Sequence, residues 1–217
     1  NGDSKPDLAL TNNSANTLTI LFNTTLSNNT SLTYTSQVVT LPSGTNPTNI
    51  ASDDFDGDGR PDLAITDWTN TRVLIYRNIS NINSISFTYT NTPLAATGNL
   101  WAITTGDLDA DGKPDIVAGG NGGSAVYIFR NTTSVGAISF SAAITSFATG
   151  STAHALAIGD IDGDGKVDLV TANYSPNTVN LYVLRNTSTG PGSIAFSSAV
   201  GFTGVSAVNS RSLALGD

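Results

Sequence analysis

The chain has 217 residues, of which 39% are hydrophobic and 12% charged, and its formal net charge is −8. This length supports a sizeable core, the composition excludes a disordered chain, and the lack of a basic stripe excludes nucleic-acid binding. The absence of cysteine excludes disulfides, thiolate zinc sites and cysteine nucleophiles. No apolar run approaches the roughly 20 residues of a membrane-spanning helix, so no membrane span is expected.

Strand signals follow one another along the whole chain. Thr, Ser, Asn, Gly, Val and Ile dominate the sequence, which favours short strands joined by tight turns and predicts an all-β protein. In the last copy, one strand precedes an acidic loop and three follow it, at 154–158, 168–171, 178–184 and 194–199. The third strand recurs at 17–22, 72–76 and 125–129, and the fourth at 32–35, 85–89 and 138–142.

The acidic loops set the repeat. Asp54, Asp107 and Asp160 begin equivalent loops 53 residues apart, and Asp217 begins another 57 residues later, giving a period of about 54. Four antiparallel strands per repeat are typical of a β-propeller blade, whereas the coils of a parallel β-solenoid, the alternative, are usually shorter. We therefore expect a single array over 1–217 with repeats at 1–53, 54–106, 107–159 and 160–216.

Each complete loop resembles a calcium-binding loop in its spacing. All 17 acidic residues are aspartates, and each loop carries four of them at positions 1, 3, 5 and 9, with glycine at position 6 for a sharp turn. Oxygen donors in this number suit Ca²⁺, and the backbone carbonyl at position 7 is a further candidate ligand. The predicted metal residues are Asp54, Asp56, Asp58, Arg60 and Asp62; Asp107, Asp109, Asp111, Lys113 and Asp115; and Asp160, Asp162, Asp164, Lys166 and Asp168.

Two alternatives compete with this interpretation. An EF-hand shares the opening pattern but needs a glutamate at position 12 and flanking helices, whereas position 12 here is Ile65, Ala118 or Thr171. A plain Asp-Gly turn without metal is the other. Two unit charges about 4 Å apart repel by roughly 4 kcal/mol at an effective dielectric constant near 20, so four clustered carboxylates favour a bound, structural cation.

The loops followed by an apolar strand resemble the FG-GAP/VCBS-type repeats of integrin-like β-propellers, over essentially the whole chain. The resemblance implies calcium ligation by the loop aspartates and a parent that is a larger bacterial protein, secreted or on the cell surface. Such propellers have seven blades, so four form an incomplete ring, which further repeats of the parent or a second chain would close. Both ends depart from the motif: Asn1, Asp3 and Asp7 fill only positions 3, 5 and 9, and Asp217 only position 1, so they form partial sites.

A candidate ligand surface lies where the copies differ. The residue six positions before each loop varies, as Thr48, Trp101, His154 and Arg211, and Trp68 and Tyr174 are expected on the same face, opposite the loops. Exposed aromatic residues with arginine suit a glycan or protein ligand, while packing between blades is the alternative. The single histidine, His154, has no second histidine with which to bind a metal and does not define a catalytic triad.

The leading functional hypothesis is a non-enzymatic, extracellular module for binding or adhesion, stabilised by Ca²⁺ at three complete sites. The alternatives are an accessory propeller domain of a secreted carbohydrate-active enzyme and a purely structural spacer. Asn-x-Ser/Thr triplets recur at equivalent places, beginning at Asn23, Asn78, Asn131 and Asn186. They could carry glycans in a eukaryotic secreted protein, and we interpret them mainly as turns.

Overall fold

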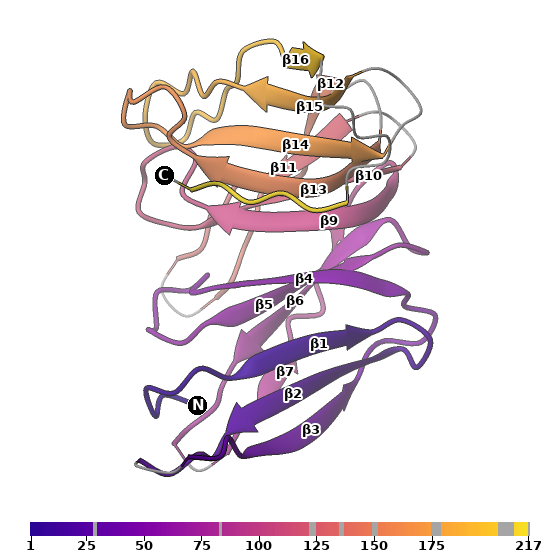
Figure 1. Ribbon diagram of the computed structural model, residues 1–217, viewed down its shortest axis with the longest axis vertical. Coiled ribbons are helices and arrows are strands. Elements are labelled where there is room, and N and C mark those ends of the chain that lie inside the picture. The colour runs from indigo at the N-terminus through magenta and orange to yellow at the C-terminus, as the bar shows by residue number, and fades with distance from the viewer. Residues whose placement is uncertain are drawn as a thin grey trace.

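A computed structural model describes residues 1–27, 30–82, 84–121, 125–134, 137–148, 152–174, 179–203 and 211–216. These residues form four antiparallel sheets, which follow one another in chain order (Figure 1). The described sheets do not close into a ring. No helix in the described ranges is long and apolar enough to cross a membrane. The predicted all-β architecture of propeller blades is confirmed.

We refer to the sheets as blades 1 to 4. Blade 1 contains β1 (Leu8–Asn12), β2 (Thr17–Asn23) and β3 (Tyr34–Thr40). Blade 2 contains β4 (Pro47–Asp53), β5 (Asp62–Asp67), β6 (Arg72–Asn78), β7 (Phe87–Tyr89) and β8 (Leu94–Ala95). Blade 3 contains β9 (Asn99–Gly106), β10 (Asp115–Asn121), β11 (Ala125–Phe129) and β12 (Ile144–Ala148). Blade 4 contains β13 (Thr152–Gly159), β14 (Asp168–Tyr174), β15 (Val179–Leu184) and β16 (Val200–Thr203).

Blades 3 and 4 are simple four-stranded meanders in which each strand pairs with its neighbours in sequence. In blade 2, β7 and β8 both pair with β6, and blade 1 has the second to fourth strands of the pattern. Because each acidic loop joins the first strand of a blade to the second, the blades begin one strand earlier than repeats counted from the loops. The first strands β4, β9 and β13 contact one another from blade to blade.

The fourth strand differs from the sequence prediction. Segments 138–142 and 194–199 do not form long strands; each is the returning arm of a small hairpin held by isolated bridges such as Asn131↔Phe140 and Asn186↔Phe196. The paired fourth strands come later, as β12 and β16. The apolar residues that suggested strands instead pack into the core from the hairpin, since Phe196 is buried there.

The core lies between blades, and each inner strand packs into it with both of its faces. Along β5, Leu63 and Ile65 pack toward blade 1, while Ala64 packs toward blade 3. A strand that is buried on both faces reads as a continuous apolar run, so every residue of β5 is buried. The second strand of blade 3, β10, approaches the first strand of blade 4, β13, so closely that a Cβ added to Gly119 would lie only 2.9 Å from the Cβ of Ala153. Small residues such as Gly119 and Ala153 are therefore needed where the strands of neighbouring blades meet.

Candidate metal centres

The acidic loops all lie at the same end of the strands. In Figure 1 the arrowhead of β9, which leads into one loop, and the arrowhead of β14, which leads out of the next, point to opposite edges of the view. The end of β9 and the start of β14 therefore lie at the same edge, and so do the two loops. Each loop is folded by its position 1 carboxylate, which accepts hydrogen bonds from backbone N–H groups ahead of it. Asp54 accepts from Asp58 (3.0 Å) and Gly59 (2.7 Å), and Asp107 accepts from Asp111 (3.1 Å) and Gly112 (2.8 Å).

Two loop positions require a left-handed backbone. Position 6 is glycine in all three loops, with φ of 84° at Gly59. Position 4 is also in the left-handed region, with φ of 73° at Gly57 and 59° at Ala110. The alanine side chain makes this backbone conformation strained at Ala110. Position 6 was predicted from the sequence and position 4 was not, although glycine occupies position 4 in two of the three loops.

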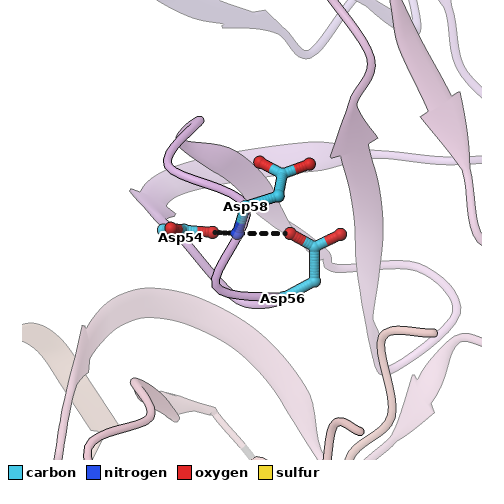
Figure 2. Close-up of side chains that lie close together, drawn as sticks. All are labelled: Asp54, Asp56 and Asp58. Carbon is cyan, nitrogen blue, oxygen red and sulfur yellow. Dashed lines mark hydrogen bonds between the residues drawn. The ribbon is translucent and has the colours of Figure 1, made fainter. Parts of the chain in front are cut away.

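Carboxylates converge in all three loops. Oxygen atoms lie within 4.8 Å of one another in three groups, which are Asp54, Asp56 and Asp58; Asp107, Asp109 and Asp115; and Asp160, Asp162 and Asp168. Figure 2 shows the first group, in which the Asp58 backbone nitrogen donates to both Asp54 and Asp56. Each loop therefore brings three of its four predicted aspartates together, and the fourth is absent from that group. The fourth residues are Asp62, Asp111 and Asp164.

The position 9 carboxylates are buried and tie the loop to the blade. The oxygens of Asp62 accept hydrogen bonds from the backbone N–H of Phe55 (3.0 Å) and of Asn78 (2.7 Å). Asp115 and Asp168 make the equivalent pairs of bonds. Burial raises the pKa of the Asp62 and Asp115 carboxyls from 3.8 to about 6, opposed by these bonds and assisted by neighbouring aspartates.

These pKa shifts predict an inverted pH dependence for calcium-depleted protein. Because the folded-state pKa is above the unfolded value, the stability contributed by protonated Asp62 and Asp115 is fully present below about pH 4 and lost as pH rises through about 6. Urea unfolding of dialysed, calcium-free protein should therefore show a smaller contribution from these groups at pH 7 than at pH 5. Asp115→Asn should weaken that trend; a trend identical to wild type would contradict it.

An arginine bridges positions 3 and 5 in each complete loop. Arg130 Nε lies 2.6 Å from Asp109 and its Nη2 lies 2.7 Å from Asp111. Arg77 contacts Asp56 and Asp58, and Arg185 contacts Asp162 and Asp164, in the same way. The recurrence of these arginines at strand ends thus has a structural cause, which is partial neutralisation of the loop.

Loss of the arginine should matter most where the carboxylate is buried. The Asp109 side chain has no exposed surface, so Arg130→Gln should destabilise calcium-free protein by about 3 kcal/mol, because the remaining charge is left buried and unpaired. The matched change Arg185→Gln should have a much smaller effect, since the Asp162 side chain is 37% exposed. Urea denaturation of both variants tests this; equal losses would show that burial does not govern the pair.

Position 7 acts through its backbone N–H and its side chain. The N–H of Arg60 donates to Asp58 at 3.0 Å, and the side chains of Lys113 and Lys166 donate to the carbonyls of Thr133 (2.7 Å) and Ser188 (2.9 Å). The position 7 side chains thus fasten the loop to its own blade. Ligation by the carbonyls of Arg60, Lys113 and Lys166 remains a prediction.

The atoms of loop 107–115 fit a cation. Asp109 Oδ1 is buried and has no hydrogen-bond partner, whereas Oδ2 accepts from Arg130 and from the N–H of Gly192 (2.6 Å). A buried carboxylate oxygen without a partner carries a large desolvation cost. A calcium ion among Asp107, Asp109 and Asp115 would satisfy it, and an all-oxygen donor set is what this ion prefers.

The partial loop at the start of the chain reproduces the local bonding. The N–H of Asp3 donates to Asn1 Oδ1 at 3.1 Å, and the N–H of Lys5 donates to Asp3 Oδ1 at 3.0 Å, as at positions 3, 5 and 7 of loops 54–62 and 160–168. Asp7 accepts from the N–H of Asn23 at 2.8 Å. No acidic group that could hold a metal was found at this loop among the described residues. Asp217 lies outside the described residues.

Of the residues expected at the ligand surface, all except Thr48 come together in one row across the opposite end of the blades. The rings of Trp68 and Trp101 meet edge to face at 5.6 Å, Trp101 stacks on His154 at 4.8 Å, and His154 stacks on Tyr174 at 4.8 Å. Arg211 lies 5.3 Å from the centre of the Tyr174 ring. We call this set the aromatic row. Trp101 and Tyr174 remain 36% and 38% exposed, although each stacks on the ring of His154.

Sequence reasoning missed the role of the recurring asparagines. Asn78, Asn131 and Asn186 are buried, and each accepts a hydrogen bond from the N–H two residues ahead, which forms the predicted turn. Their side-chain amides bond to carbonyls, and those of Asn131 and Asn186 reach the preceding blade. Recurrence once per repeat was the available signal of a structural role.

Together, the successive antiparallel sheets and the acidic loops that precede their second strands define a repeat protein built from propeller-type blades. An FG-GAP-like repeat model matches three times, at residues 1–65, 54–118 and 107–171, and an FG-GAP repeat model matches at 152–194. The chain therefore belongs to the FG-GAP-like repeat family, as the resemblance predicted. A search of curated proteins gave no match.

Proposed function

We propose that this chain is a calcium-stabilised extracellular binding module that has no catalytic site of its own. The observation that carries the calcium assignment is the threefold convergence of carboxylates, together with the buried, unpartnered Oδ1 of Asp109. Calcium binding at such loops offsets the repulsion among their charges and holds the blades in place. An extracellular location suits this role, because calcium modules of modest affinity work outside the cell.

The aromatic row supports the binding function. It lies at the end of the strands away from the acidic loops, and its terminal Arg211 has no carboxylate partner among the described residues. Every other described lysine or arginine contacts a carboxylate or a backbone carbonyl. Because stacked rings present their electropositive edges outward, this surface favours a partner rich in oxygen acceptors, such as a glycan or an acidic protein segment.

The environment of His154 supports the non-catalytic part of the proposal. The imidazole is held between the rings of Trp101 and Tyr174, and its Nδ1 has no hydrogen-bond partner. Burial, with a smaller effect from Arg211, lowers the pKa of His154 below its usual 6.5. A general base needs an orienting partner on its second nitrogen, which this arrangement does not supply.

A glycan array and a protein pull-down test the binding surface directly. We expect specific binding by wild-type protein that Trp101→Ala abolishes while calcium-dependent melting is retained. Ile161→Ala, at the opposite end, is the control that should leave binding intact. Binding unaffected by Trp101→Ala would remove the aromatic row from the proposal. A folded protein that binds nothing would favour a spacer, and the presence of a catalytic domain in the parent would favour the accessory-domain alternative.

A further inference from the structure

Each complete acidic loop carries an apolar residue at position 2, between two aspartates. Phe55 and Leu108 occupy this position in the first two loops and are 1% and 2% exposed, because each inserts into the core of the following blade. Phe55 meets Phe140 of blade 3 edge to face at 5.4 Å. Ile161, at the same position of the third loop, is 48% exposed. Loops 54–62 and 107–115 therefore each contact two blades.

The backbone at position 2 is held from the following blade as well. The side-chain amide of Asn131 donates to the carbonyl of Phe55 at 3.0 Å, and that of Asn186 donates to the carbonyl of Leu108 at 2.9 Å. The same amides donate to their own blade at Pro114 and Val167. Each asparagine thus bridges the acidic loop of one blade to the acidic loop of the next.

These contacts reach the candidate metal ligands directly. The N–H of Leu108 donates to Asp115 at 2.9 Å, and its carbonyl accepts from Asn186, so a single residue links a position 9 carboxylate to blade 4. In addition, Gly192 of blade 4 donates its N–H to Asp109 Oδ2 at 2.6 Å. Bonds of this kind orient metal ligands, and their loss lowers metal affinity by about 10-fold to 100-fold.

We infer that the following blade raises the calcium affinity of loops 54–62 and 107–115, with Asn131 and Asn186 as the respective positioning residues. This inference rests on the calcium binding proposed above. By thermodynamic reciprocity, calcium bound in one blade strengthens the docking of the next by the same factor. Calcium then fastens blades to one another rather than only closing individual loops.

Site-resolved calcium titration followed by hydrogen exchange tests this coupling. Amide exchange in peptides covering loops 54–62, 107–115 and 160–168 is measured against calcium concentration for wild type, Asn186→Ala and Asn78→Ala. Asn78 is the matched control, because its described amide bond, 2.9 Å to Pro61, stays within its own blade. Asn186→Ala should raise the calcium midpoint of loop 107–115 by about 10-fold and leave loop 54–62 unchanged.

The outcomes separate coupling from a local role. A local role predicts that Asn186→Ala shifts only loop 160–168, as Asn78→Ala shifts only loop 54–62, and that result would overturn the inference. If no wild-type loop responds to calcium, the proposed calcium function itself fails, and the coupling fails with it. Should Asn186→Ala not fold, Asn131→Ala makes the same comparison at loop 54–62, and Asn186→Ser is the milder change.

Discussion

Removal of calcium is expected to lower the melting temperature of this protein by roughly 15–30 °C. Three sites, each holding calcium at about 100 times its dissociation constant, stabilise the folded state by about 8 kcal/mol in total. That amount is comparable with the whole stability of an ordinary domain, about 5–15 kcal/mol. In each loop, oxygen atoms of three carboxylates lie within 4.8 Å of one another. Without the ion, the bridging arginine offsets only part of the repulsion among them.

Differential scanning calorimetry with saturating calcium and with EGTA at neutral pH measures this shift. Restoring calcium in excess over the chelator should recover the original melting temperature, which separates metal removal from irreversible damage. Magnesium should recover little of it, because Mg²⁺ demands a compact octahedral site and loses its water reluctantly. A shift of less than about 2 °C would mean that the loops fold without metal and would reject the structural role.

Phe55→Ala should be the most damaging single substitution in an acidic loop, with a loss of about 3–5 kcal/mol in the free energy of unfolding. The side chain is buried in the core between blades 2 and 3 and packs against Phe140, so truncation leaves a cavity in both blades. Ile161→Ala changes the same loop position where the side chain is 48% exposed, and it should cost less than about 1 kcal/mol.

Urea denaturation in saturating calcium compares the two variants on equal terms. Saturation removes differences in metal occupancy, so the remaining gap reports the packing of position 2 in the following blade. If the two substitutions lower the free energy of unfolding equally, position 2 acts through the loop conformation alone, and the insertion of Phe55 into the next blade does not stabilise the protein. Leu108→Ala provides a second buried example and should resemble Phe55→Ala.

The blade architecture and the acidic loops were predictable because they rest on local patterns that recur. The spacing from Asp54 to Asp107 and to Asp160 located the loops, and the alternation of turns and apolar runs located most strands, including 125–129. The fourth strand was misplaced because Phe140 and Phe196 look like strand residues, although they reach the core from a hairpin. Apolar periodicity reports burial and does not distinguish a strand from a buried loop.

Contacts between blades were the part that the sequence did not reveal. Phe55 and Leu108 stand at a variable loop position, and nothing local shows that they pack in the next blade rather than their own. The aromatic row was predicted only as a shared face; the stacking of His154 between Trp101 and Tyr174 depends on the spacing between neighbouring blades. Such distances arise from tertiary packing, which a single sequence does not specify.

The burial of the recurring asparagines affects how the protein can be produced. Asn78, Asn131 and Asn186 each begin an Asn-x-Ser/Thr triplet, yet in the folded chain their amides are enclosed and bonded to carbonyls. The secretory pathway of a eukaryotic host attaches its oligosaccharide to such triplets in surface positions, and a bulky sugar cannot be accommodated at these sites. A sugar added before folding would keep neighbouring blades apart, so a bacterial expression host suits this chain better than yeast or animal cells.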